Sequence, residues 1–149
     1  MAMSAIPVLP NGLPAPRPAP DGLDTPYWSA ASRHELAVQR CERCSTFQWG
    51  PEWICHRCHS FDMGWETVAP EGLIYSWERV WHPVHAAVAE ACPYVVVLVE
   101  LPHAGGVRMV GNLIGGDRSV VSIGAPVATV FEDHADPENA YTLVQWRTV

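Results

Sequence analysis

The hydrophobic pattern of the chain changes character twice, near residue 25 and again near residue 69. Residues 1–24 show no apolar periodicity and are rich in proline, which lacks a backbone N–H and resists helix and sheet. Residues 25–68 alternate in short pieces around four cysteines, and later runs are β-branched and aromatic with turn residues between them. We therefore divide the chain into a proline-rich extended arm (1–24), a helix with a cysteine-rich module (25–68) and a β domain (69–149).

The β domain contains five predicted strands, and the second of them is apolar at every position from Val95 to Val99. Five short strands with one longer insertion fit a small, partly open barrel, although the period alone does not separate a barrel from a small sandwich. The predicted strands are Gly72–Trp81, Tyr94–Leu101, Val107–Ile114, Pro126–Asp133 and Tyr141–Arg147.

A short helix is predicted where the proline-rich arm ends. Thr25 followed by Pro26 is a typical start, because a threonine side chain can cap a helix and proline fits its first turn. The helix is expected to run to about His34, with a buried side formed by Tyr27, Trp28 and Ala31. The arm itself is expected to be extended, and either mobile or draped over a partner.

The strongest chemical signal is a pair of C-x₂-C motifs separated by ten residues. Two residues between cysteines let both sulfurs of a tight turn face one point, so two such turns can close on a tetrahedral metal ion. Four thiolates leave no vacant position, which suits a structural zinc better than a catalytic one. A redox iron site of the rubredoxin type and a redox dithiol are the competing interpretations. The predicted zinc ligands are Cys41, Cys44, Cys55 and Cys58.

Composition narrows the possible functions. The chain has 149 residues, 48% of them apolar, which is enough for one domain or two small modules with a real core. Its nine basic residues are all arginine and its formal charge is −7, so it is a poor candidate for binding the phosphate backbone of a nucleic acid. Because it has neither a membrane-length apolar run nor a basic and apolar leader, we expect a cytoplasmic protein with no membrane or nucleic-acid partner.

No catalytic constellation is evident in the sequence. His56 and His59 flank the second C-x₂-C motif, but four cysteines already complete a ligand set, so both are expected on the surface or behind the ligands. Cys92 stands alone before Pro93 and is expected to be a small core residue, because no pattern assigns it a base. The predicted set of catalytic residues is therefore empty.

One segment of the β domain carries more chemistry than the rest. Trp77, Arg79 and Trp81 alternate, so they should share one face of a strand as an aromatic and cationic shelf or as packing at the edge of the core. His82 and His85 follow in a loop, which could contact a ligand or a partner, or could be plain surface.

With these pieces in order, the chain resembles the DUF35 family of proteins, in which a rubredoxin-like zinc ribbon precedes an OB-fold barrel. The resemblance covers residues 24–147 and is carried by motifs in every part of that range. They are Tyr27-Trp28, His34-Glu35-Leu36, Gln39-Arg40-Cys41 with the other three cysteines, Gly72 to Trp77, Pro93-Tyr94 with the run to Leu101, Gly111 to Ile114, and Ile123 to Val127 with Phe131-Glu132-Asp133. Ser45 departs from the family pattern, because it stands where a glycine is common.

The resemblance implies a mainly β fold with a short N-terminal helix, a zinc ribbon and a five-stranded OB barrel. It implies an accessory subunit, without activity alone, that binds and positions acyl-CoA for a thiolase-fold partner such as a thiolase or a lipid-transfer-type aldolase. Steroid side-chain degradation is one such setting. The candidate CoA contacts are Trp77, Arg79, Trp81, His82 and His85. Two alternatives remain at this stage, a single-stranded nucleic-acid binder and an iron-containing electron carrier.

Overall fold

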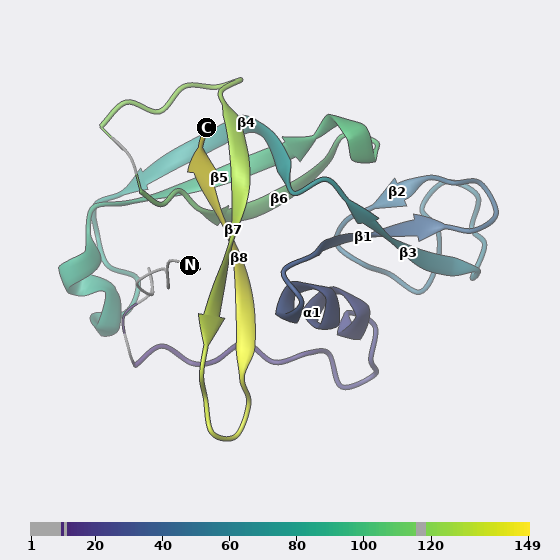
Figure 1. Cartoon of the computed structure of the whole chain (residues 1–149), viewed down its shortest axis with the longest axis horizontal. Coiled ribbons are helices and arrows are strands. Elements are labelled where there is room, and N and C mark those ends of the chain that lie inside the picture. Colours follow the sequence, from purple (N-terminus) through teal and green to yellow (C-terminus); the bar gives the residue numbers. More distant parts are fainter. Residues whose placement is uncertain (1–9, 11, 116–118) are drawn as a thin grey trace.

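A computed structural model describes residues 10, 12–115 and 119–149, and the first nine residues of the predicted arm lie outside this part of the chain. Two sheets follow one another along the chain (Figure 1): a small three-stranded sheet beside the only α-helix of the described residues, and a larger five-stranded sheet that curls into a barrel. No helix of the described residues is long and apolar enough to cross a membrane.

The elements lie close to where the hydrophobic pattern places them. The five predicted strands of the β domain are present with shifts of one or two residues at their ends. The elements are α1 (Thr25–Ser32), β1 (Leu36–Cys41), β2 (Phe47–Gln48), β3 (Met63–Val68), β4 (Glu71–Val80), the 3₁₀ helix η1 (Ala86–Ala91), β5 (Tyr94–Leu101), the 3₁₀ helix η2 (Pro102–Ala104), β6 (Val107–Asn112), β7 (Pro126–His134) and β8 (Tyr141–Thr148).

Helix α1 begins where predicted and ends earlier. Asp24 is its N-cap residue in place of Thr25, and the Asp24 side chain accepts from the Trp28 indole instead of capping the helix backbone. The helix ends at Ser32 because His34 adopts a left-handed backbone conformation (φ 59°), which turns the chain into β1. Its fully buried positions are Ala30 and Ala31, because small side chains let the helix approach the sheets closely.

The larger sheet has the strand order β6-β5-β4-β7-β8 with every neighbouring pair antiparallel. The odd-numbered residues of β5, from Val95 to Leu101, are buried in the core, and its even-numbered residues are half-buried, which explains why the strand is mostly apolar on both faces. A parallel bridge from Leu113 to Trp146, and the Ile114 N–H that donates to the Trp146 carbonyl, bring the two edges together. The sheet is therefore a nearly closed five-stranded barrel, and the predicted OB-type architecture is confirmed.

Buried polar side chains close the rest of the seam between β6 and β8. Gln145 accepts from the backbone N–H of Asn112 on β6 at 2.8 Å, and its amide donates to Glu132 on β7 at 2.9 Å. Glu132 is only 1% exposed, and its other carboxylate oxygen bonds His134 at 2.8 Å. A buried carboxylate is tolerated only when its oxygens have hydrogen-bond partners, so these side chains form one structural unit.

A single hydrophobic core joins the two sheets. Ala31, Leu36 and Val38 of the helix and ribbon belong to the same buried cluster as the inward side chains of β4, β5 and β8, among them Ile74 and Trp146. The predicted boundary near residue 69 therefore marks a change of local structure within one continuous core.

The described part of the arm lies against the rest of the chain. The Pro16 carbonyl accepts from Asn139 in the β7–β8 loop at 3.2 Å, and Asp21 accepts from the Trp53 indole of the ribbon at 3.0 Å. Figure 1 shows the arm running along the lower side of the molecule, past the β7–β8 hairpin and into α1. Residues 12–24 are thus draped over their own chain, whereas the sequence suggested mobility or a separate partner.

Candidate metal centre and barrel mouth

Two turns with the same backbone pattern carry the four cysteines. In the first, the Cys41 N–H donates to the Thr46 carbonyl and the Ser45 N–H donates to the Cys41 carbonyl. In the second, the Cys55 N–H donates to the Ser60 carbonyl and the His59 N–H donates to the Cys55 carbonyl. Each turn ends in a left-handed residue, Ser45 (φ 61°) and His59 (φ 58°), a conformation that glycine adopts more easily. Ser45 therefore adopts the left-handed conformation that the turn requires although it is not a glycine.

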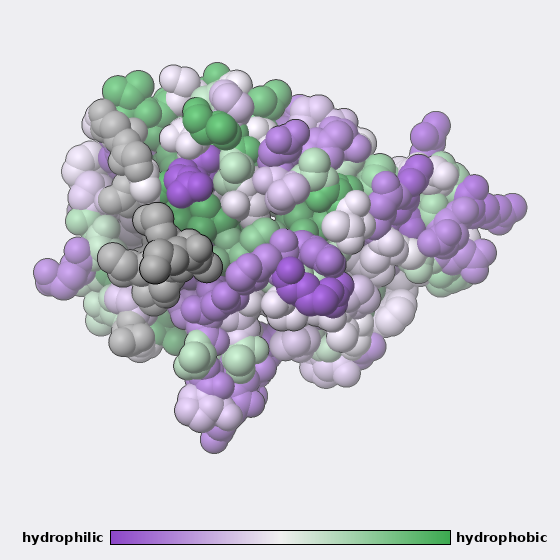
Figure 2. Space-filling model, in the orientation of Figure 1, coloured by the Kyte–Doolittle hydropathy of each residue, from purple (hydrophilic) through white to green (hydrophobic). Residues whose placement is uncertain are grey.

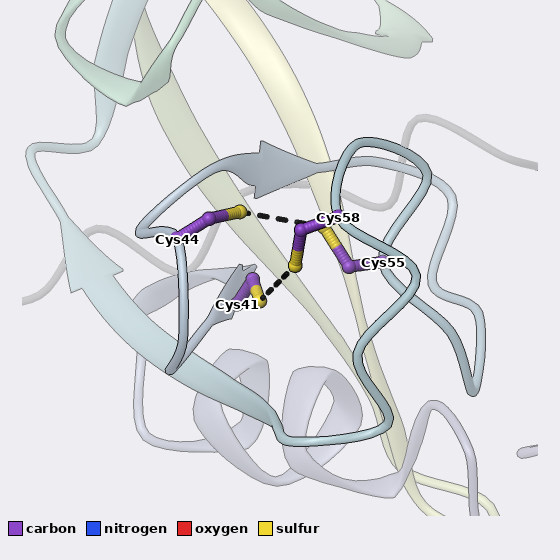
Figure 3. Close-up of side chains that lie close together, drawn as sticks. All are labelled: Cys41, Cys44, Cys55 and Cys58. Atoms are coloured by element: carbon purple, nitrogen blue, oxygen red, sulfur yellow. Dashed lines mark hydrogen bonds between the residues drawn. The ribbon is translucent and has the colours of Figure 1, made fainter.

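The four sulfurs converge on one point (Figure 3). All of them lie within 4.8 Å of one another, and the Sγ–Sγ distances Cys41–Cys58 and Cys44–Cys55 are both 3.6 Å. A zinc tetrahedron with Zn–S bonds of roughly 2.3 Å has edges of about 3.8 Å, so the spacing fits this ion. Because none of these cysteines is in a disulfide, all four are available as ligands.

The local environment of the sulfurs favours a bound cation. The Thr46 hydroxyl, which lies 3.1 Å from the Cys44 sulfur, is the main reason that the pKa of this thiol falls to about 6. A backbone hydrogen bond at Ser60 favours the Cys58 thiolate, but burial and the three neighbouring sulfurs outweigh it and raise the pKa of Cys58 to about 12. Four crowded sulfurs cannot all ionise without a positive charge at their centre, which a divalent metal ion supplies.

Two buried glutamines fix the loop that leads to the second turn, a role that was not predicted for either of them. Gln39 on β1 makes a pair of hydrogen bonds with the backbone of Glu52, at 2.8 and 3.0 Å. Gln48 on β2 donates to the Ile54 carbonyl and accepts from the His56 N–H. A glutamine amide can bond one backbone N–H and one backbone carbonyl of a loop at once. Both side chains therefore supply hydrogen bonds that a neighbouring strand would otherwise provide. Their alternation with apolar strand residues is only a weak signal in the sequence.

His56, His59, His85 and Cys92 lie outside the four-cysteine cluster. His56 and His59 are exposed, as expected. Cys92 is half-buried, so its predicted place in the core is wrong, because it precedes β5 at the open end of the barrel. His85 is the N-cap of η1, where its Nδ1 accepts from the Ala87 N–H at 3.1 Å.

The predicted shelf lies at the mouth of the barrel. Trp77 and Arg79 are paired across the sheet with the buried residues Val97 and Val95, so they project from the inner face of β4 at its open end. The Arg79 guanidinium lies 5.6 Å from the Trp77 ring. Trp81 follows the end of β4 and lines a groove together with Arg79. His82 and His85 are exposed in the next loop, outside the lining of this groove.

Fold and site together define a protein in which a four-cysteine ribbon is built onto an OB-type barrel. Sequence comparison identifies both parts: residues 28–64 match the "ChsH2, rubredoxin-like zinc ribbon domain" and residues 65–132 match the "ChsH2, C-terminal OB-fold domain". The chain belongs to the ChsH2-type DUF35 family.

Solved structures agree with this assignment. The chain described as "Ltp2-ChsH2(DUF35) aldolase" is 38% identical, with a TM-score of 0.75 over 89% of this chain and 98% of that chain. A DUF35 protein of unknown function from Sulfolobus solfataricus is 11% identical with a TM-score of 0.60, over 88% of this chain and 87% of that one, which shows a shared fold.

Two curated relatives are longer proteins. A probable enoyl-CoA hydratase alpha subunit from Thermomonospora curvata is 41% identical over 83% of this chain. The 3-oxo-4,17-pregnadiene-20-carboxyl-CoA hydratase alpha subunit from Mycobacterium tuberculosis is 30% identical over 80% of this chain. The chain spans 37% and 36% of their lengths, a little over a third of each.

Proposed function

We propose that this chain is a noncatalytic accessory subunit that binds and positions an acyl-CoA for a thiolase-fold enzyme, either a thiolase or a lipid-transfer-type aldolase. The observation that carries the proposal is the similarity along nearly the whole chain to a ChsH2 chain whose structure is described as an aldolase with Ltp2. The names of both curated relatives refer to CoA esters, and one of these esters is a pregnadiene derivative. A steroid side-chain ester is therefore the leading substrate class.

In this proposal the ribbon is a structural zinc site. Cys41, Cys44, Cys55 and Cys58 hold the ion, and the closed shell leaves no position for a substrate. The metal fixes the two cysteine turns relative to each other. It thereby stabilises a ribbon sheet whose own hydrophobic core is small. The reacting groups then belong to the partner.

The proposed contacts with the CoA ester lie at the barrel mouth. Trp77, Arg79 and Trp81 present aromatic rings and one cation, and His82 and His85 lie in the adjoining loop. None of these side chains forms a nucleophile and base pair among the described hydrogen bonds, so they are suited to positioning. Holding a substrate in a productive geometry accelerates a reaction without supplying a reacting group.

Co-expression with a thiolase-fold protein encoded beside this chain tests the proposal. We expect the two proteins to co-purify as a complex and acyl-CoA turnover to require the complex, with this chain inactive alone. Trp81→Ala, His82→Ala and His85→Asn should weaken assembly or raise KM more than they lower kcat. Asparagine is chosen at position 85 because it preserves the cap of η1.

Turnover of acyl-CoA by this chain unaided would show that the proposal is wrong. So would a partner that is equally active and stable without it. Val110→Ser is the control substitution, because Val110 is exposed on β6 and does not line the groove.

A further inference from the structure

We propose that the mouth of the barrel binds the apolar acyl group of the CoA ester and leaves the nucleotide outside; this inference rests on the function proposed above. The groove there has a volume of about 260 Å³. It opens between the end of β4 and the start of β5, and its lining is mostly apolar: Arg79, Trp81, Pro93, Val95 and Ser119.

The groove reaches the core of the barrel. Val95, at its floor, is buried and belongs to the central hydrophobic cluster together with Val97. Trp77 lies on the same inner face of β4, two residues before Arg79. A hydrocarbon entering the groove would therefore meet the core surface at Val95 and the ring of Trp81, as in ligand sites at barrel mouths.

Large apolar side chains are exposed on the two loops that border the groove. Trp81 is 65% exposed and Val84 is 84% exposed on the loop after β4. Val120 is 72% exposed next to Ser119, and Ile123 is 71% exposed further along the same loop. Isolated exposed apolar residues need no explanation, but Trp81 in the groove lining, Val84 on the same loop and Val120 next to the lining residue Ser119 indicate a surface that is covered in use.

The charges around the groove disfavour the nucleotide of CoA. Its pyrophosphate and 3′-phosphate would need several arginine or lysine donors. Among the described residues of the lining Arg79 is the one cation, and it is already engaged, since it donates to the Ser119 carbonyl at 3.3 Å and lies over Trp77. Glu78 and Glu90 carry exposed carboxylates on β4 and η1. Nine of the sixteen acidic residues but only four of the nine arginines follow residue 68. This balance fits an uncharged acyl chain or ring system.

Calorimetric titration of the full chain with three probes distinguishes the contribution of the acyl group to the affinity from that of the nucleotide. The probes are decanoyl-CoA, S-decanoyl-pantetheine, which lacks the nucleotide, and free CoA, all below their critical micelle concentrations. We expect the two decanoyl probes to bind with affinities within about threefold of each other, and free CoA to bind at least about tenfold more weakly. Each methylene removed from the acyl chain should cost about fourfold in affinity.

Matched substitutions locate the site. Trp81→Ala and Val84→Ser should weaken decanoyl-CoA binding about fivefold or more. Phe61→Ala in the ribbon and Val110→Ser on β6 remove equally exposed apolar groups elsewhere and should leave the affinity unchanged. An equal loss in the control variants would mean nonspecific binding and would overturn the proposal.

Failure of this inference is distinguishable from failure of the proposed function. If free CoA binds as tightly as decanoyl-CoA, or no decanoyl probe binds to the chain alone or in its complex, the inference is wrong even when the complex forms. If decanoyl probes bind as expected but no thiolase-fold partner assembles with the chain, the accessory role is wrong and the acyl site stands.

Discussion

At the scale of single residues, Asp133 ties together three segments of the chain. Its carboxylate accepts from the Thr142 hydroxyl on β8 at 2.7 Å and pairs with His34 at 2.8 Å, at the junction of α1 and β1. The hydrogen bond from Thr142 is the main cause of the lowered pKa of Asp133, and His34 adds to it. The His34 ring also stacks on Phe131. The contact therefore fixes the ribbon side of the molecule to the β7–β8 hairpin.

Thr142→Val should raise the pKa of Asp133 toward its ordinary value of 3.8. A lowered pKa in the folded state gives stability that is present above 3.8 and is lost as pH falls through the folded-state value. The variant should therefore lose less stability on acidification than the natural chain. The pKa is read from a carboxyl NMR titration and the stability from urea unfolding between neutral and acid pH.

Thr129→Val is the control for this substitution, because the Thr129 hydroxyl is buried on β7 without a hydrogen-bond partner. It should leave the pKa of Asp133 unchanged and should not lower stability, since no hydrogen bond is lost. An unshifted pKa of Asp133 in Thr142→Val would contradict the assignment.

At the scale of elements, the ribbon depends on groups other than its own strands. Its sheet has the order β2-β1-β3, and β2 has only two residues. The long loop before Cys55 is held by the amides of Gln39 and Gln48, and the two turns meet at the sulfurs and through the Glu42 N–H, which donates to the Asp62 carbonyl. Because the four cysteines lie outside the shared hydrophobic core, we expect a bound metal to contribute much of the folding free energy of the two turns.

Purified protein should contain close to one zinc ion per chain, measured by elemental analysis, because the four sulfurs form one site. Cys44→Ser and Cys58→Ser should release the ion and expose the amides of β1 and β3 to fast hydrogen exchange. Cys92→Ser is the matched control, since Cys92 lies outside the cluster and should keep both metal and protection. Stoichiometric iron, together with visible thiolate-to-iron absorption, would show that the zinc prediction is wrong and would support the electron-carrier interpretation.

At the scale of the whole molecule, one face is crossed by the N-terminal arm. The Cβ that an alanine would place at Gly12 would lie 3.5 Å from Ala87 of η1, so the arm lies beside η1 at this residue. It then bonds Asn139 of the β7–β8 loop and Trp53 of the ribbon. Figure 2 shows a mostly polar surface at the right, where the ribbon lies, and apolar patches at the upper left, over the barrel. The arm thus runs from η1 at the barrel to the ribbon.

Trp53→Phe should loosen the arm without unfolding the core, because it removes only the indole donor to Asp21. We expect the amides of Ala19 and Gly22, which are hydrogen-bonded within the arm, to exchange several-fold faster in NMR measurements. The amides of β5 should keep their protection. Phe61→Ala, on another exposed part of the ribbon, should change neither set. Unchanged exchange at Ala19 and Gly22 would mean that the arm is held by its own turns.

The sequence by itself determined the positions of α1 and the five barrel strands and predicted the four candidate metal ligands. Strand positions followed from β-branched runs between turn residues, because those signals act over a few neighbouring residues. The spacing of Cys41 and Cys44, repeated at Cys55 and Cys58, indicated one site, because the reach of a tight turn is a local property. The family resemblance supplied the order ribbon then barrel, which composition alone could not.

Only the tertiary structure decided which distant groups meet. The amide of Gln145 bridges β6 and β7, and Trp77 turns inward beside Val97, because strand register sets these contacts and residues far apart in sequence share it. The same holds for the arm, whose prolines predicted an extended chain but not the surface it follows. Local sequence fixes local conformation, whereas the barrel mouth and the shared core exist only after the strands have paired and brought distant side chains together.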